Sequence, residues 1–287
     1  AGGGIKVVDL STTLQPSTPT LQLPTEFGWG VSWPFHIEEI SRYDDRGPAW
    51  YWNNFKCGEH TGTHFDAPIH WVSGKDYEEH ATDTLPVERF IAPACVIDAV
   101  AESAANPDFL ITVDFIKNWE AQHGEIEAGS WLLYRTDWSK MTNNEAYLNM
   151  AEDGAHTPGW EPEAVTFLTN ERNVCGIGVE TVGTDGGQAA GQEPMFPCHN
   201  LLHGANKCGL AGLCNLDLLP PKGAVIIAPK LGTVAASDHK KALNLAGLHG
   251  LDDGLGLTEH AGVVVPSLGL SAGRGLQIAD LQGLLDH

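Results

Sequence analysis

One stretch of the chain reads Glu59-His60-Thr61-Gly62-Thr63-His64-Phe65-Asp66-Ala67-Pro68-Ile69-His70-Trp71. It gathers three of the thirteen histidines of the chain, and a carboxylate, within a few positions of one another. Two neutral imidazoles and a carboxylate make a divalent-cation site that leaves coordination positions open for water or substrate. We therefore predict that His60, His64 and Asp66 bind a metal ion and that His70 is left free for proton transfer.

The spacing of these residues restricts the backbone that can carry them. In a straight strand His60 and His64 would lie about 13 Å apart at ~3.3 Å per residue, whereas each ligand reaches a metal ion at only about 2 Å. A helix would turn Asp66 away, and Pro68 would break it. We therefore predict a sharp bend at Gly62, followed by an extended run in which His64 and Asp66 share a face.

The alternative is that these histidines belong to a solvated surface loop. A catalytic zinc site needs three protein ligands and an open position, and this segment alone supplies them, so we favour the metal site. A metal-binding protein without catalysis would leave His70 without a role. Non-haem iron oxygenases usually pair a close histidine and carboxylate with a distant histidine, so they are the distant alternative.

Composition narrows the classes of protein to which the chain can belong. Its 287 residues, 42% of them apolar, can bury a core in one large domain or two ordinary ones. The formal charge of −21 argues against nucleic-acid binding, and the absence of a long apolar run argues against a membrane span. The first residues lack a signal-peptide pattern. The six cysteines form no C-x-x-C pair, which favours reduced thiols in a cytoplasmic protein.

Alternating apolar strands and helices along the chain predict a mixed α/β fold. The helix expected from residue 112 begins at a threonine and has Gly124 as its stop signal. Residues 11–24 are rich in threonine and proline and are expected to form a loop. We expect strands at 5–10, 94–98, 131–136, 174–180 and 224–229, and helices at 112–120, 162–172 and 278–285.

Large aromatic residues crowd the stretch between residues 28 and 52, interleaved with glycine and proline. They can form an apolar wall for a flat substrate, or they can be ordinary core or subunit-interface residues. We favour Trp52 for the substrate pocket because it lies eight residues before His60. Trp71, directly after His70, is the second aromatic candidate for substrate binding.

Two further histidines follow Pro197. His199 opens an expected helix, a position from which side chains commonly face a site, so it is a candidate substrate-binding residue. An isolated histidine is usually structural, and we expect that role for His203, one turn later. Asp137 and Trp138 follow an expected strand, where ligands gather in α/β sheets, but their expected role is structural too.

The pattern His60-x-Gly-Thr-His64-x-Asp66-x-Pro-x-His70 resembles the signature of the metal-dependent cyclase-like hydrolases. That family includes bacterial kynurenine formamidases, isatin hydrolases and trans-dienelactone hydrolases. Within it, five other segments of the chain look most like the isatin hydrolases, and the resemblance covers roughly residues 5 to 230. These segments are Leu21-Gln22-Leu23-Pro24, Gly74-Lys75-Asp76-Tyr77, Ser103-Ala104-Ala105-Asn106-Pro107-Asp108-Phe109-Leu110, Arg135-Thr136-Asp137-Trp138 and His199-Asn200-Leu201-Leu202-His203.

This resemblance implies a swivelling β/β/α fold, with a mixed sheet and flanking helices, in a single domain of residues 1–287 whose tail, 231–287, does not follow the pattern. It implies one manganese or zinc ion on the three ligands predicted above, and a homodimer or homotetramer. His70 matches the acid/base histidine of the family, and His199 matches one that contacts substrate or a second metal. Two-metal formamidases carry a glutamate where this chain has Ala211, so we expect a single ion.

The expected reaction is the opening of a cyclic amide by metal-activated water, with isatin converted to isatinate. The metal would polarise the scissile carbonyl and lower the pKa of its bound water toward about 7. His70, with a reference pKa of about 6.5, would take the proton and deliver it to the leaving atom. Cys57 has no recognisable Cys-His framework. The alternatives are a lactone hydrolase of the trans-dienelactone type and an arylformamidase acting on N-formylkynurenine.

Overall fold

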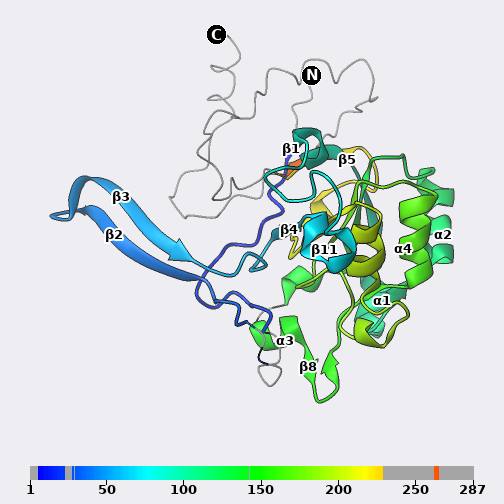
Figure 1. Ribbon diagram of the computed structural model, residues 1–287, viewed down its shortest axis with the longest axis horizontal. Coiled ribbons are helices and arrows are strands. Elements are labelled where there is room, and N and C mark those ends of the chain that lie inside the picture. The colour runs from blue at the N-terminus through cyan, green and yellow to red at the C-terminus, as the bar shows by residue number, and fades with distance from the viewer. Residues whose placement is uncertain (1–5, 23–27, 29, 142, 229–261, 265–287) are drawn as a thin grey trace, which may run out of the picture.

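The computed structural model of the protein describes residues 6–22, 28, 30–141, 143–228 and 262–264. Figure 1 shows a central sheet with helices packed at one side and a long hairpin that reaches away from it. The expected α/β class, a mixed sheet with flanking helices, is confirmed. The helix expected at 278–285 lies outside the described residues. The assignment of one domain to residues 1–287 stays a prediction.

Eight strands form the central sheet, in the order β1, β14, β13, β5, β7, β11, β12, β4. Neighbours run parallel except where β13 meets β5 and where β12 meets β4. All five expected strands are present, although β5 begins earlier than expected and β1 is shorter. The bounds are Lys6–Val7 for β1, His64–Asp66 for β4, Ile91–Asp98 for β5, Trp131–Arg135 for β7, Gly176–Val179 for β11, Cys208–Ala211 for β12, Ala224–Ile227 for β13 and Gly262–Val264 for β14.

The middle of this sheet is buried on both faces. Trp131 and Leu133 of β7 pack into one apolar cluster, whereas Leu132 and Tyr134 pack into the other, and none of the four is more than 1% exposed. This alternation follows from the period of two in a strand. Strands covered on both faces are expected to be continuous apolar runs, which is why the sequence predicts the central strands well.

Helices α2 and α4 cover one face of the sheet and contribute Ile116, Trp119 and Leu168 to its apolar cluster. The start of α2 is as predicted, because the side chain of Thr112 accepts a hydrogen bond from the backbone amide of Phe115. The helix ends before Gly124, which has φ +84°. The helices are α1 (Val100–Ala105), α2 (Val113–His123), α3 (Asn144–Leu148) and α4 (Pro162–Asn170).

A two-stranded hairpin, β2 (His36–Asp44) and β3 (Gly47–Lys56), extends away from the body of the chain (Figure 1). The sequence did not predict it, because large rings occupy successive positions and hide the alternation that marks a strand. Five large apolar side chains on the hairpin are more than a third exposed: Ile37, Tyr43, Trp50, Trp52 and Phe55. The hairpin therefore presents an apolar surface to its surroundings.

Short elements complete the described chain. β6 (Leu110–Ile111) pairs in parallel with β10 (Gly159–Trp160), and β8 (Met150–Ala151) pairs in antiparallel with β9 (Gly154–Ala155). All six cysteines are unpaired, as expected. Within the described ranges, the helices lack the length and apolar character that crossing a bilayer demands. Single 3₁₀ turns lie at Pro68–His70, Val72–Gly74, Val87–Phe90, Trp138–Lys140, Ala189–Gly191 and Leu216–Leu218, and a π turn at Cys198–Leu202.

Candidate metal centre

Strand β4, at the edge of the sheet, carries two of the three predicted metal ligands. His64 and Asp66 occupy alternate positions of the strand, so their side chains leave on the same face, as predicted. The neighbouring strand β12 places Ala211 opposite His64 and Gly209 opposite Asp66. A Cβ on Gly209 would lie 3.2 Å from the Cβ of Asp66, so the small partner leaves room for the carboxylate.

The chain turns sharply just before β4, at the predicted position. Gly62 has φ +68°, a left-handed conformation that glycine adopts without strain. A Cβ at this position would lie 2.6 Å from Cδ2 of Leu14. The turn folds His60 back toward the strand, so that the ring centroids of His60 and His64 lie 5.0 Å apart. The predicted bend is confirmed.

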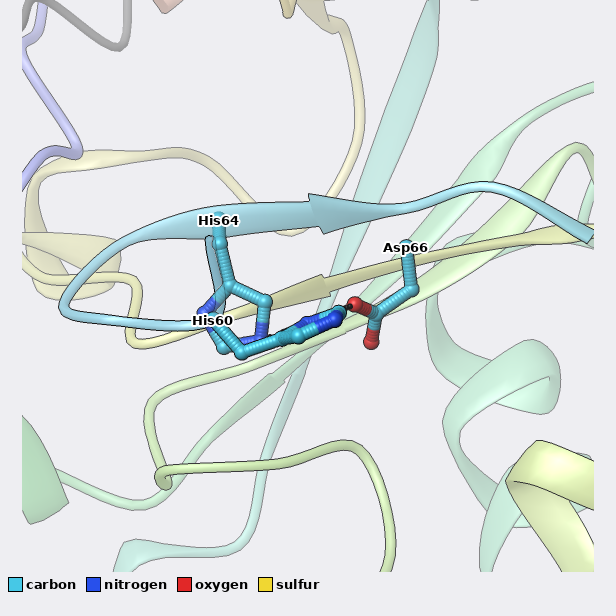
Figure 2. Close-up of side chains that lie close together, drawn as sticks. All are labelled: His60, His64 and Asp66. Carbon is cyan, nitrogen blue, oxygen red and sulfur yellow. Dashed lines mark ion pairs between the residues drawn. The ribbon is translucent and has the colours of Figure 1, made fainter. Parts of the chain in front are cut away.

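The three predicted ligands converge, as Figure 2 shows, with one ligand atom of each within 4.8 Å of the others. Oδ1 of Asp66 lies 2.9 Å from Nδ1 of His60 and 3.6 Å from Nε2 of His64. This buried oxygen lies at ion-pair distance from both imidazoles but is not matched to a hydrogen-bond partner among the described residues. An unpaired buried carboxylate oxygen is costly. A carboxylate oxygen and two imidazole nitrogens are ligands that a divalent cation accepts. A cation bound between the three side chains would interact with this oxygen.

The protonation states of His64 and Asp66 also suit a metal. Nδ1 of His64 lies 2.8 Å from the carbonyl oxygen of Gly62, which can only accept, so Nδ1 carries the hydrogen and Nε2 keeps its lone pair. Burial lowers the pKa of His64 and keeps its ring neutral. Burial alone would raise the pKa of Asp66, but the surrounding histidines, His64 foremost, lower it below its usual value. A metal ion binds a neutral imidazole and an ionised carboxylate.

His70 follows β4 in a 3₁₀ turn and lies against the ligands. The centroid of its ring is 4.0 Å from that of His60, 5.1 Å from that of His199 and 5.9 Å from that of His203. Burial and these neighbouring imidazoles, opposed by Asp66, lower the pKa of His70 to about 3. The sequence suggests the reference value of about 6.5, because it does not reveal that four imidazoles pack together. The ring is neutral and can accept a proton.

Two of the predicted substrate-binding residues lie beside this cluster. The ring centroid of Trp71 is 4.9 Å from that of His199 and 5.8 Å from that of Phe196. A ligand atom of His199 also lies within 4.8 Å of one from Asp66 and one from His70. The fold thus brings the segment around Cys198–Leu202 against the metal-ligand segment, although the two are distant in sequence.

Trp52, the third predicted substrate-binding residue, does not lie beside the cluster of its own chain. Trp52 lies on β3, is 55% exposed, and packs against Trp50 with ring centroids 6.3 Å apart. The hairpin that carries it points away from the body of the chain (Figure 1). Its predicted role therefore depends on what covers the hairpin.

Two residues near the cluster were not predicted to serve the site. Asp185, in the loop after β11, has its Oδ2 2.5 Å from Nδ1 of His199. Its place after the end of a parallel strand is the signal that sequence reasoning could have used. His203 is fully buried, with Nδ1 3.0 Å from the carbonyl oxygen of Lys207 and Nε2 without a partner among the described residues. Its structural role stays a prediction.

Asp137 and Trp138, for which a structural role is expected, have contacts of that kind. Asp137 forms ion pairs with Arg135 at 3.0 Å and Lys140 at 2.9 Å. Trp138 is buried, and its indole N–H donates to the carbonyl oxygen of Tyr147. These contacts hold the segment that follows β7.

Comparison with known proteins agrees with this geometry. The Cyclase family model matches residues 8–186. An isatin hydrolase from Roseibium aggregatum is 54% identical over 80% of this chain and 87% of its own length. A kynurenine formamidase from Salinibacter ruber is 24% identical over 78% of this chain and 89% of its own.

Among solved structures, one is described as an isatin hydrolase bound to the product analogue thioisatinate. It is 53% identical, covers 79% of this chain and 86% of its own, and superposes with a TM-score of 0.77. The swivelling β/β/α fold implied by the sequence motif is therefore the fold of the protein. By its fold, by its match to the family model and by its identity to a curated relative, this chain belongs to the Cyclase family.

Proposed function

We propose that this protein is a metal-dependent hydrolase that opens the ring of a cyclic amide, with isatin as substrate and isatinate as product. The observation that carries the proposal is the convergence of His60, His64 and Asp66 with His70 directly beside them. The 54% identity to an isatin hydrolase supports the choice of substrate. The bound product analogue in the similar solved structure supports it too.

One divalent ion, Mn²⁺ or Zn²⁺, would be held by those three ligands, since both metals accept imidazole and carboxylate groups. Bound there, the ion supplies Lewis acidity, which polarises a carbonyl group and makes water more acidic. The buried Oδ1 of Asp66, which lies between the two imidazoles, and the free lone pair on Nε2 of His64 support this arrangement. Ala211, opposite His64 in the sheet, offers no ligand atom, which supports a single ion.

His70 is the residue we propose for proton transfer. Its neutral ring takes a proton from the water that attacks the amide carbonyl as the new C–O bond forms. As the C–N bond breaks, that proton passes to the leaving nitrogen, which becomes the free amine of the product. The lowered pKa of His70 makes its protonated form a stronger acid for the second transfer and its neutral form a weaker base for the first.

Trp71 and His199 are the residues we propose to contact the flat substrate, because their rings lie against each other beside His70. Trp52 is exposed on a hairpin that extends away from its own cluster, and we propose that it contacts a second copy of the chain. This supports the expected homodimer or homotetramer, in which the exposed apolar side chains of the hairpin would be removed from water.

The net charge and the free thiols bear on the ligand class and the cellular location that we propose. The formal charge of −21 supports a small molecule rather than a nucleic acid as ligand. Six unpaired thiols suit a reducing compartment, which supports the expected cytoplasmic location.

A substrate panel tests the proposed function. The full chain is stripped of metal by a chelator, reloaded with manganese or zinc, and offered isatin, a dienelactone and N-formylkynurenine, with the masses of the products recorded. We expect isatin to gain one water, and activity to vanish on chelation and return with either metal. Activity that survives thorough chelation would refute the metal mechanism. Turnover of the lactone or the formamide alone would move the function to that class, and oxygen consumption with iron(II) would indicate an oxygenase.

A further inference from the structure

One carboxylate holds His199 at two points. Oδ2 of Asp185 lies 2.5 Å from Nδ1 of the His199 ring and accepts a hydrogen bond from the His199 backbone amide at 3.1 Å. Oδ1 of Asp185 accepts a second backbone hydrogen bond, from the amide of Cys198 at 2.7 Å. Because ring and backbone are tied to the same group, the His199 side chain has little freedom to rotate.

The carboxylate is itself fixed in place. The Asp185 side chain is 5% exposed and that of His199 is 15% exposed. Two residues further along the loop, the backbone amide of Gly187 donates to the carbonyl oxygen of Thr157 at 3.0 Å. A Cβ on Gly187 would lie 2.1 Å from the carbonyl oxygen of Ala155, so the loop packs on that segment without any side chain between them. Asp185 therefore approaches His199 from a rigid support.

This contact decides which nitrogen of the ring carries the hydrogen. A carboxylate only accepts, so in the neutral ring the hydrogen stays on Nδ1 and Nε2 keeps a lone pair. Nε2 is then the nitrogen left for the cluster, where a ligand atom of His199 lies within 4.8 Å of Asp66 and His70. A lone pair accepts hydrogen bonds. It therefore matches the ring N–H of a cyclic amide, a group that a lactone lacks.

We propose that Asp185 is a positioning residue that holds the Nδ1–H of His199 so that Nε2 accepts a hydrogen bond from the N–H of the substrate. The proposal rests on the proposed function and deepens it, because it names the group by which a cyclic amide is distinguished from a lactone. The structural alternative is that Asp185 only anchors the start of the turn Cys198–Leu202. The two roles differ in what they require of the imidazole.

The tautomer of His199 can be measured in the full-length protein labelled with ¹⁵N-histidine, its signals being assigned by their loss in His199→Gln. We expect a hydrogen on Nδ1 and none on Nε2, and we expect Asp185→Ala to shift both signals. Asp108→Asn is the matched control, because Asp108 lies 2.7 Å from Nδ1 of His156 in a pair outside the cluster. It should leave the His199 signals unchanged. A hydrogen on Nε2 of wild-type His199 would overturn the proposal, whether or not the enzyme hydrolyses isatin.

A double-mutant cycle separates positioning from anchoring. We expect Asp185→Ala to lower kcat/KM for isatin about 10- to 100-fold. In a His199→Ala background the same change should lower kcat/KM by less than about twofold, because Asp185 acts through His199. Asp185→Ala should lower kcat/KM less for N-methylisatin, which has no ring N–H, than for isatin. Equal losses in both backgrounds would assign Asp185 a structural role and refute the proposal, and Asp185→Asn serves the same cycle if the alanine variant does not fold.

Discussion

Nδ1 of His64 donates a hydrogen bond to the carbonyl oxygen of Gly62, at 2.8 Å. This bond ties a predicted metal ligand to the same bend that brings His60 back to the strand. The arrangement of the ligands therefore depends on a backbone conformation, φ +68°, that glycine adopts without strain. The conformation of Gly62 therefore sets the positions of the His60 and His64 imidazoles.

Replacement of Gly62 by alanine should therefore weaken metal binding without removing any ligand. The added Cβ meets Leu14 at 2.6 Å and disfavours the left-handed backbone, so the carbonyl that orients His64 moves. We expect about 10- to 100-fold weaker affinity for manganese or zinc, measured by competition with a chelator. Gly191→Ala is the control, because a Cβ there has no atom within 4 Å. Unchanged affinity in Gly62→Ala would contradict the role of the bend.

Replacement of His70 should separate metal binding from turnover. His70→Ala removes the proposed proton carrier and leaves the three ligands in place, so metal content should stay near that of the wild type. We expect kcat to fall about 10²- to 10⁴-fold, the usual effect of losing a general acid/base. His156→Ala, at a histidine that pairs with Asp108, should leave kcat unchanged. Full turnover by His70→Ala would contradict the acid/base assignment.

Much of this fold can be predicted because its signals are local. The cap at Thr112 and the stop at Gly124 bound α2 within one short stretch of sequence. The apolar run of β7 shows that both of its faces are covered. The metal ligands are local too, so the spacing of His60, His64 and Asp66 was enough to predict the bend between them.

The remaining features depend on contacts between segments that are distant in sequence. The pKa of His70 is lowered partly by His199 and His203, which arrive from another part of the chain. The contact between Asp185 and His199 spans a loop whose path is set by packing, not by a pattern in the sequence. The hairpin was missed for a different reason, because aromatic residues on both of its faces removed the alternation on which strand prediction depends.

The exposed rings of the hairpin make the assembly testable. Trp50 and Trp52 are 49% and 55% exposed, and a glutamate at both positions would place two charges on an apolar surface. We expect the double variant to have a smaller mass than the wild type in light scattering and to lose activity at the same concentration. Met150→Glu, at a 64% exposed position on β8, should have the mass and the activity of the wild type. An unchanged mass and unchanged activity in the double variant would contradict the proposed assembly.

A last prediction concerns stability rather than catalysis. Arg172 contacts Glu120 in a two-pronged ion pair, Nε to Oε1 at 2.7 Å and Nη2 to Oε2 at 2.9 Å, which joins α2 to the segment after α4. The two side chains are only 14% and 9% exposed. Burial alone would raise the pKa of Glu120, but Arg172 and the backbone amide of Ile126 lower it below its usual value.

The sign of the pH dependence follows from that shift. Because the pKa of Glu120 is lower in the folded than in the unfolded state, the pair stabilises the fold at neutral pH, and this stabilisation is lost as the pH falls through the folded-state pKa. We expect Glu120→Gln to lower the free energy of unfolding by about 1–3 kcal/mol at neutral pH and by less in acid, measured by urea unfolding. Glu163→Gln, at an exposed position in the first turn of α4, should show no such difference. A loss in Glu120→Gln that is equal at both pH values would mean that packing rather than charge holds these segments together.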